Sequence, residues 1–99
     1  MIVYISIGNS DDKLTQAEWA TFYRETNLLL RQYGHTHGQW VSEPASAWQN
    51  ACWCLDMRPE LDGTLGLKND LGHLAGKFNQ DSIAWAEAKD TEFLGAQSG

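Results

Sequence analysis

The sequence predicts an α+β fold in which four strands and two helices follow the order β-α-β-β-α-β. Apolar and polar residues alternate near both ends of the 99-residue chain, as in half-buried strands. Two longer segments carry apolar residues at helical spacing, and two short apolar segments between them predict a hairpin. This is the order of the split-βαβ, or ferredoxin-like, sandwich, in which both helices cover one face of a four-stranded antiparallel sheet. Right-handed crossovers would place the first and third strands in its centre, and the alternative is an open sheet of different strand order.

The first strand is expected at residues 1–7, which read "MIVYISI". Successive strand residues point to opposite faces of a sheet, so the alternation sorts the side chains into two sets. The set that we expect to meet the helices is Val3, Ile5 and Ile7, and the opposite set is Ile2, Tyr4 and Ser6. The polar residues at 8–11 predict the turn that follows.

The first helix is expected at about 16–33. Thr15 is a suitable N-cap, and Glu18 completes a Thr-x-x-Glu capping box with it. Gly34 stands where a C′ glycine ends many helices.

The middle hairpin is expected to join a strand at about 38–43, entered by a loop, to a strand at 50–56. Its register is open between two alternatives. If Trp40 opposes Cys52, these two residues share a face and Trp53 lies on the other face. If the register slips by one residue, every side chain of one strand changes face and Trp40 joins Trp53.

The rest of the chain predicts a second helix at about 64–78 and a last strand at 81–88, where "DSIAWAEA" alternates. Residues 91–94 are expected to make a short final contact with the domain. We therefore predict one domain over residues 1–94 and a flexible tail over residues 95–99.

Composition narrows the classes of partner. The formal charge is −6, and the seven basic residues are scattered along the chain. Binding of nucleic acid needs clustered lysine and arginine, so no direct nucleic-acid role is expected, and the same argument applies to anionic membranes. The initial apolar run is too short for a signal peptide or a membrane span. These features predict a cytoplasmic protein with reduced thiols.

Five tryptophans are more than one small core readily buries. In either hairpin register, at least one tryptophan should lie near Tyr4 on the sheet face away from the helices. We therefore predict an aromatic binding patch on that face, formed by Tyr4, Trp40, Trp53 and Trp85. The alternating alanines of the last strand suit close contact with the helices, which would leave Trp85 outside; alternatively, Ile83 and Trp85 belong to the core.

Cysteine and histidine are zinc-binding residue types, and the chain has the pairs Cys52–Cys54 and His35–His37. Their spacing is not that of a zinc finger, because two strand residues separated by one other point to the same side about 7 Å apart. A disulfide between them would be strained, and the Cys-x-x-Cys spacing of redox sites is absent. The sequence favours strand packing for the cysteines, and it predicts no metal, no cofactor and no catalytic residue.

Two further pairs are secondary candidates. His35 and His37, together with the turn after the first strand, could line a small-molecule site. Gln80 and Asp81 stand at a helix-to-strand junction, where polar side chains often cap free backbone groups, and we favour that structural role for them.

The segments "NLLLRQYG", "WQNACWC" and "FNQDSIAWAE" resemble a family of small uncharacterised proteins of actinobacteria and their phages. The resemblance covers most of residues 15–94. It implies a compact cytoplasmic domain and carries no activity with it.

The function that these features favour is a small cytoplasmic, non-enzymatic binding module that acts through an aromatic open sheet face. Its partner would be a protein or a second copy of the chain, and by analogy with phage proteins it could be a host protein. The alternative is a small-molecule binder or modest enzyme that uses the His35–His37 loop. A flat apolar face favours the first function, and a concave pocket with convergent polar groups favours the second.

Overall fold

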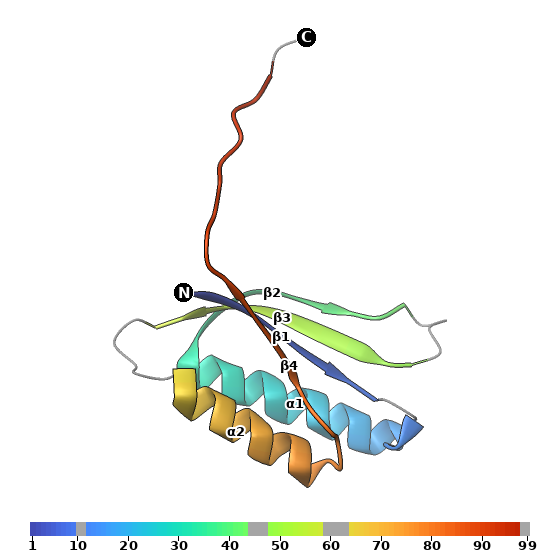
Figure 1. Ribbon diagram of the computed structural model, residues 1–99. Coiled ribbons are helices and arrows are strands. Elements are labelled where there is room, and N and C mark those ends of the chain that lie inside the picture. Colours follow the sequence, from blue (N-terminus) through green and yellow to red (C-terminus); the bar gives the residue numbers. More distant parts are fainter. Residues whose placement is uncertain (10–11, 44–47, 59–63, 98–99) are drawn as a thin grey trace.

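The structure, a computed structural model, describes residues 1–9, 12–43, 48–58 and 64–97. Within these residues the protein is α+β, and its elements are β1 (Ile2–Gly8), α1 (Gln16–Tyr33), β2 (Gly34–Val41), β3 (Asn50–Met57), α2 (Thr64–Lys77) and β4 (Ala84–Ala88) (Figure 1). Parts of four predicted features lie outside the described residues: the turn after the first strand, the connection within the hairpin, the break before the second helix and the end of the tail.

The four strands form one sheet in the order β2-β3-β1-β4, and every neighbouring pair is antiparallel. β1 and β3 therefore occupy its centre, and β1 and β2 run in the same direction with β3 between them. Figure 1 shows α1 and α2 side by side beneath the sheet, so that the upper surface of the sheet is free of helices.

The core fills the layer between the sheet and the helices. Its members come from both central strands and from both helices, and those whose side chains are fully buried include Val3, Ile5, Phe22, Leu30, Trp53, Leu55 and Leu67. Burial of each such side chain contributes about 1.5–3 kcal/mol. The ring of Phe22 also stacks on that of Phe78, with 4.9 Å between the ring centroids.

The two helices are also joined by polar contacts. The Tyr33 hydroxyl donates to Oδ2 of Asp70 at 2.6 Å, and this hydrogen bond raises the pKa of Tyr33. Lys77 Nζ lies 2.8 Å from Oε1 of Glu25. Neither of the helices in the described ranges is long and apolar enough to cross a bilayer.

The start of α1 confirms the predicted capping box. The Thr15 hydroxyl accepts from the Glu18 backbone N–H at 3.2 Å, and the Glu18 carboxylate accepts from the Thr15 backbone N–H at 2.9 Å. The predicted role of Gly34 is wrong. Its φ of 175° is extended, so it is not a left-handed cap, and it opens β2 directly after the helix. A side chain there would meet the backbone of Asp56 and Met57 on β3.

The pairing of β2 with β3 follows one of the two predicted registers in one part of the hairpin and the other register in the rest, and a β-bulge separates the two parts. Residues 38–41 pair in the register that sets Trp40 opposite Cys52. Residues 34–36, which were expected to be a loop, pair one residue out of phase with them. His37 is the extra residue between the two segments, as in a β-bulge.

β4 is shorter than expected, and the chain leaves the sheet after Ala88. Residues 89–97 continue as an extended tail on the side opposite the helices (Figure 1). The contact expected at residues 91–94 does not form, because Phe93 is 91% and Leu94 83% exposed. The radius of gyration is accordingly 15.3 Å, against about 13 Å for a compact domain of this length.

Candidate functional site

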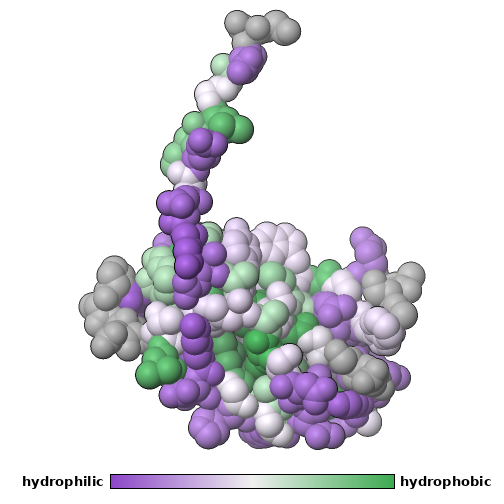
Figure 2. Space-filling view, viewed as in Figure 1, coloured by the Kyte–Doolittle hydropathy of each residue, from purple (hydrophilic) through white to green (hydrophobic). Residues whose placement is uncertain are grey.

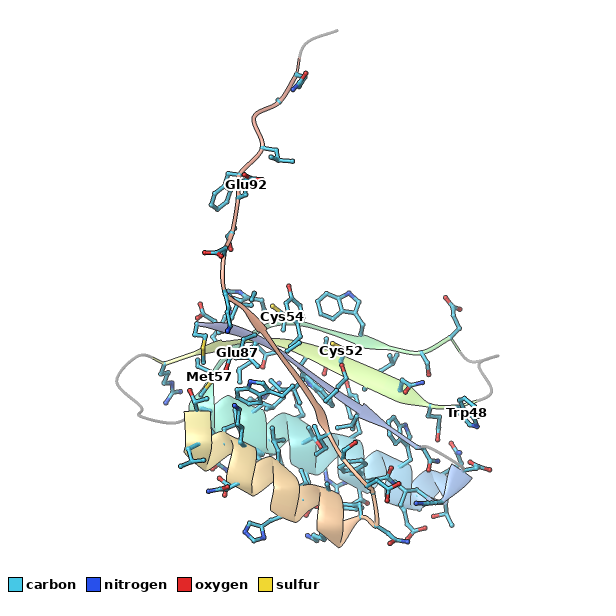
Figure 3. The ribbon with its side chains drawn as sticks, in the orientation of Figure 1. Trp48, Cys52, Cys54, Met57, Glu87 and Glu92 are labelled. Carbon is cyan, nitrogen blue, oxygen red and sulfur yellow. The ribbon has the colours of Figure 1, made fainter. Side chains whose placement is uncertain are left out.

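The sheet surface that faces away from the helices is the candidate site, and we call it the open face. Paired residues of antiparallel strands point to the same side, so the register assigns its members from the buried positions of Val3 and Ile5. Its members are Ile2, Tyr4, Ser6, Gly8, His35, Gly38, Trp40, Asn50, Cys52, Cys54, Asp56, Ala84, Ala86 and Ala88. Figure 3 shows Cys52 and Cys54 on the upper side of β3, away from the helices.

The centre of the open face carries no formal charge. Asp56 is the one carboxylate among its members, none of which is a lysine or arginine, whereas 20% of the whole chain is charged. In Figure 2 the upper margin of the body is mainly pale or green, while the strongest purple lies on the helices below and at the base of the tail. A low content of charged residues at the centre of a surface patch is typical of protein–protein interfaces.

Tyr4 lies opposite Cys54 at the middle of the open face and is 40% exposed. A hydrogen bond with the Cys54 thiol raises the pKa of the Tyr4 phenol, and the charge that either thiolate would carry acts in the same direction. The phenol therefore stays neutral at physiological pH. It offers a partner an apolar ring with a polar tip, a combination that is enriched at interfaces.

Trp40 is the most exposed aromatic side chain of the open face, at 56%. A Cβ built at Gly38 would lie 3.6 Å from its ring, so the ring extends back along β2 over the bare backbone of Gly38. The structure thus places Trp40 and Tyr4 on the predicted face, on either side of the cysteines of β3.

The prediction that Trp53 lies on the open face is wrong. Trp53 pairs with Ile5 and Gln39 on the helix side of the sheet and is fully buried. Its indole N–H donates to Asn27 of α1 at 3.1 Å, and its ring lies 5.2 Å from that of Tyr23. It belongs to the core.

Trp85 also lies on the helix side, because it pairs with Ile5, and the alanines of β4 take the open face instead. Burial of the larger side chain against the core outweighs the fit of alanine beneath a helix. Lys68 Nζ lies 5.1 Å from the Trp85 ring centroid, and the indole N–H donates to Glu87 at 3.2 Å.

Gln80 and Asp81 line a hollow of about 420 Å³ between α2 and β4. The Gln80 backbone N–H donates to Ala75 at 2.9 Å and its side chain donates to the Phe78 carbonyl, as expected of a group that caps the helix end. Asp81 is exposed and lies 3.8 Å from Lys13 Nζ. Neither residue lies on the open face.

His35 and His37 gather beside Asp56 at one end of the open face. Their rings meet edge to face with 4.9 Å between centroids, and His37 Nε2 lies 3.4 Å from Asp56 Oδ2. This contact, followed by that of the N-terminal amine, lowers the pKa of Asp56. The turn after β1 follows Gly8 at the opposite end of the sheet, so the structure does not bring the histidines and that turn together.

His35 lines a hollow of about 320 Å³ together with Gly34, Asp56, Met57 and Arg58. In the part of the chain that the structure describes, no group of three or more His, Cys, Asp or Glu is placed to hold a metal ion. The free cysteines lie on the open face, with Cys54 buried and Cys52 half-buried.

The sequence analysis did not predict that the C-terminal tail carries two exposed apolar side chains. Phe93 and Leu94 stand clear of the domain, and Figure 3 shows their neighbour Glu92 well above the sheet. The signal available in the sequence was two adjacent large apolar residues within an otherwise polar segment.

No family model matches this chain, and no curated protein or solved structure matches it either. The resemblance to small proteins of actinobacteria and their phages therefore stays a prediction.

Proposed function

We propose that this chain is a binding module for a protein partner and that the open face is its binding surface. The observation that carries the proposal is the combination of two exposed aromatic side chains, Tyr4 and Trp40, with a sheet surface whose centre has no charge. Aromatic side chains dominate binding energy where they are surrounded by contacts that exclude water. The alanines of β4 have small side chains, so on one side of Tyr4 a partner could approach the backbone of the sheet closely.

We further propose that the fold is the split-βαβ, or ferredoxin-like, arrangement. Support comes from the antiparallel order β2-β3-β1-β4. Helix α1 connects β1 to β2, which have β3 between them, and α2 connects β3 to β4, which have β1 between them. Such a sheet has one face that its helices leave available, which is the face we propose for binding.

The chemistry of the surface favours a neutral, partly apolar partner over a basic one. The acidic side chains that give the chain its net charge lie outside the open face, except for Asp56 at its end beside His37. If the resemblance to phage proteins is meaningful, a host protein is one such partner, and this step is an analogy. A cytoplasmic setting suits both free thiols.

A small-molecule site beside His35 is the second candidate, and the observation that favours it is the hollow next to the paired imidazoles. Against it, the hollow is shallow and opens widely to solvent, whereas ligand sites usually enclose most of the ligand. The pKa of Asp56 is lowered, so this carboxyl is charged at neutral pH and is a weak general base.

The binding proposal can be tested by photo-crosslinking in the native cell. Benzoylphenylalanine placed at Tyr4 should form a covalent adduct with a protein, and Trp40→Asp in the same chain should reduce that adduct about tenfold or more because it puts a charge into the interface. The adducts are separated by mass and identified by peptide sequencing.

Leu65 provides the matched control. It is a large apolar residue, 70% exposed, and lies on α2 away from the open face. The probe at Leu65 should give only background adducts, and Leu65→Asp should leave the Tyr4 adduct unchanged. Equal labelling from both probe positions would reject the open face as the binding surface.

A further inference from the structure

We infer that the partner is a second copy of this chain, and that residues 89–97 of each copy lie against the open face of the other. This inference rests on the proposed function of the open face and names its occupant. The two surfaces that it joins are the open face and the apolar pair Phe93–Leu94, both uncovered in the single chain.

The tail starts on the open face of its own chain, which is the surface that it would help to cover on the other chain. Ala88, the last residue of β4, pairs with Ile2 on the open face. From there the chain rises away from the helices in Figure 1, and Figure 2 shows a green segment part of the way along the tail, clear of the body. Phe93 and Leu94 are the large apolar residues of this tail, and they are 91% and 83% exposed.

The length of the tail fits a stacked partner. Packed sheets lie about 10 Å apart, and an extended chain advances about 3.3 Å per residue. Phe93 is five residues beyond Ala88, so the extended chain between them, about 16 Å long, can cross the gap of about 10 Å obliquely and bring Phe93 against the open face of a stacked sheet. The remaining residues then lie along the second copy and not over the chain from which they come.

The area of the open face explains why the tail is needed. Four strands at about 4.8 Å spacing and about 7 residues of 3.4 Å give a flat area of about 450 Å². A stable interface usually buries about 800 Å² per partner. Side-chain relief and a tail of nine extended residues supply the missing area, whereas two sheets packed without their tails fall short.

Symmetry favours a second copy over an unrelated protein. Each chain carries one open face and one tail with an apolar pair that projects from it, so a two-fold pair covers both surfaces of both chains in a single arrangement. The uncharged centre of the open face also lets two chains of charge −6 approach without facing like charges at the contact. The remaining repulsion lies at the rim and is screened by salt.

Sedimentation of the purified full chain tests the inference. The wild-type protein should sediment at twice its 11.1 kDa mass at micromolar concentration. Phe93→Ser with Leu94→Ser should raise the dimer dissociation constant about tenfold or more, because two large apolar side chains no longer become buried. The fold of this variant should be unchanged, since both residues are exposed in the single chain. Leu65→Ser is the matched control and should sediment as the wild type.

The outcomes separate this inference from the proposed function. A wild-type chain that sediments at 11.1 kDa at all concentrations, or a dimer that the tail substitutions do not weaken, overturns the inference. The probe at Tyr4 can still form an adduct with another protein in the first case, or with a second copy in the second case, and then the proposed function stands. Loss of every adduct at Tyr4 removes both.

A second probe tests the geometry. Benzoylphenylalanine at Phe93, in a tagged chain mixed with an untagged chain, should form an adduct between the two chains at peptides from β2 or β3. An adduct confined to the tagged chain itself, or one placed on α1 or α2 of the other chain, would show that the tail does not lie against the partner's open face.

Discussion

The indole N–H of Trp53 donates to Oδ1 of Asn27 over 3.1 Å, and this bond joins the centre of β3 to the middle of α1. Trp53 is fully buried, so the bond satisfies a polar group that water does not reach. It also explains how a tryptophan side chain fits into the core of a small domain, since an indole is tolerated there when its N–H has an acceptor.

Asn27→Leu should therefore destabilise the protein. Leucine has a similar volume but no acceptor, and an unsatisfied buried donor costs about 1–3 kcal/mol. The free energy of unfolding is measured by urea denaturation followed by circular dichroism. Asn69→Leu is the control, because Asn69 is an exposed asparagine on α2, and its substitution should change stability by less than about 0.5 kcal/mol. Equal effects of the two substitutions would contradict the role assigned to Asn27.

The position of Trp53 also shows where sequence reasoning reaches its limit. Alternation establishes that Trp53 and Leu55 share a face, but it does not say which face meets the helices. The same holds for Trp85, whose strand alternates tryptophan with alanine and so allows either assignment. Stronger local signals succeeded: the capping box at Thr15 and the apolar spacing that follows it located α1 at the residues where it occurs.

The bulge at His37 leads to a second prediction. Deleting His37 removes the one residue that has no partner, so both paired segments of β2 continue in a single phase and every side chain keeps its face. The variant should keep its fold and lose no more than about 1 kcal/mol, since it gives up an exposed contact with Asp56.

Deleting Gln39 is the matched comparison. This deletion exchanges faces within β2 in either of two ways, because a shift of one residue moves side chains to the other face. If the bulge is kept, Trp40 moves to the helix side, and if the bulge is lost, Gly38 moves there and takes the place of Gln39 opposite Trp53. It should cost several times more stability than the deletion of His37, as measured by denaturation under the same conditions. If the two deletions are equally tolerated, the register described for the hairpin is incorrect.

The hairpin register could not be predicted because the chain uses both phases. A bulge needs no glycine or other marked residue, and His37 carries no signal that it is the unpaired position. For the same reason, the members of the open face could not be predicted, since the register of β2 against β3 decides which side chains lie on the same face as Trp40. The uncharged centre of the face therefore became visible only in three dimensions.

Gly34 provides a third prediction. Gly34→Ala should destabilise the protein by about 1–3 kcal/mol, as overpacking does, because the new methyl group meets the backbone of β3, including the Met57 Cα at 2.9 Å. Gly72→Ala should do the reverse. Gly72 is exposed within α2 with no atom near the added methyl group, and alanine in a helix is favoured over glycine by about 0.5–1 kcal/mol. Thermal denaturation of the two variants should give shifts of opposite sign, and a shared sign would contradict the close approach at Gly34.

The capping box makes stability depend on pH in a direction that can be worked out. The hydrogen bond from the Thr15 backbone N–H is the main cause that lowers the pKa of Glu18 in the folded chain, below its usual 4.5. A carboxyl whose folded pKa is depressed stabilises the fold above its unfolded pKa and loses that contribution as the pH falls through the folded value. The stabilisation is therefore complete at neutral pH, begins to decline near pH 4.5 and is lost as the pH falls through the lower folded pKa.

Glu18→Gln isolates the charge, because glutamine can still accept the Thr15 N–H through its carbonyl oxygen while the attraction of a carboxylate to the helix N-terminus is removed. The wild type should be more stable than this variant at pH 7, and the two should converge as the pH falls below the folded pKa of Glu18. Urea denaturation at several pH values between 3 and 7 measures the difference, with Glu43→Gln at an exposed site beyond β2 as control. A difference between wild type and Glu18→Gln that stayed constant over this range would mean that the ionised Glu18 carboxylate does not stabilise α1.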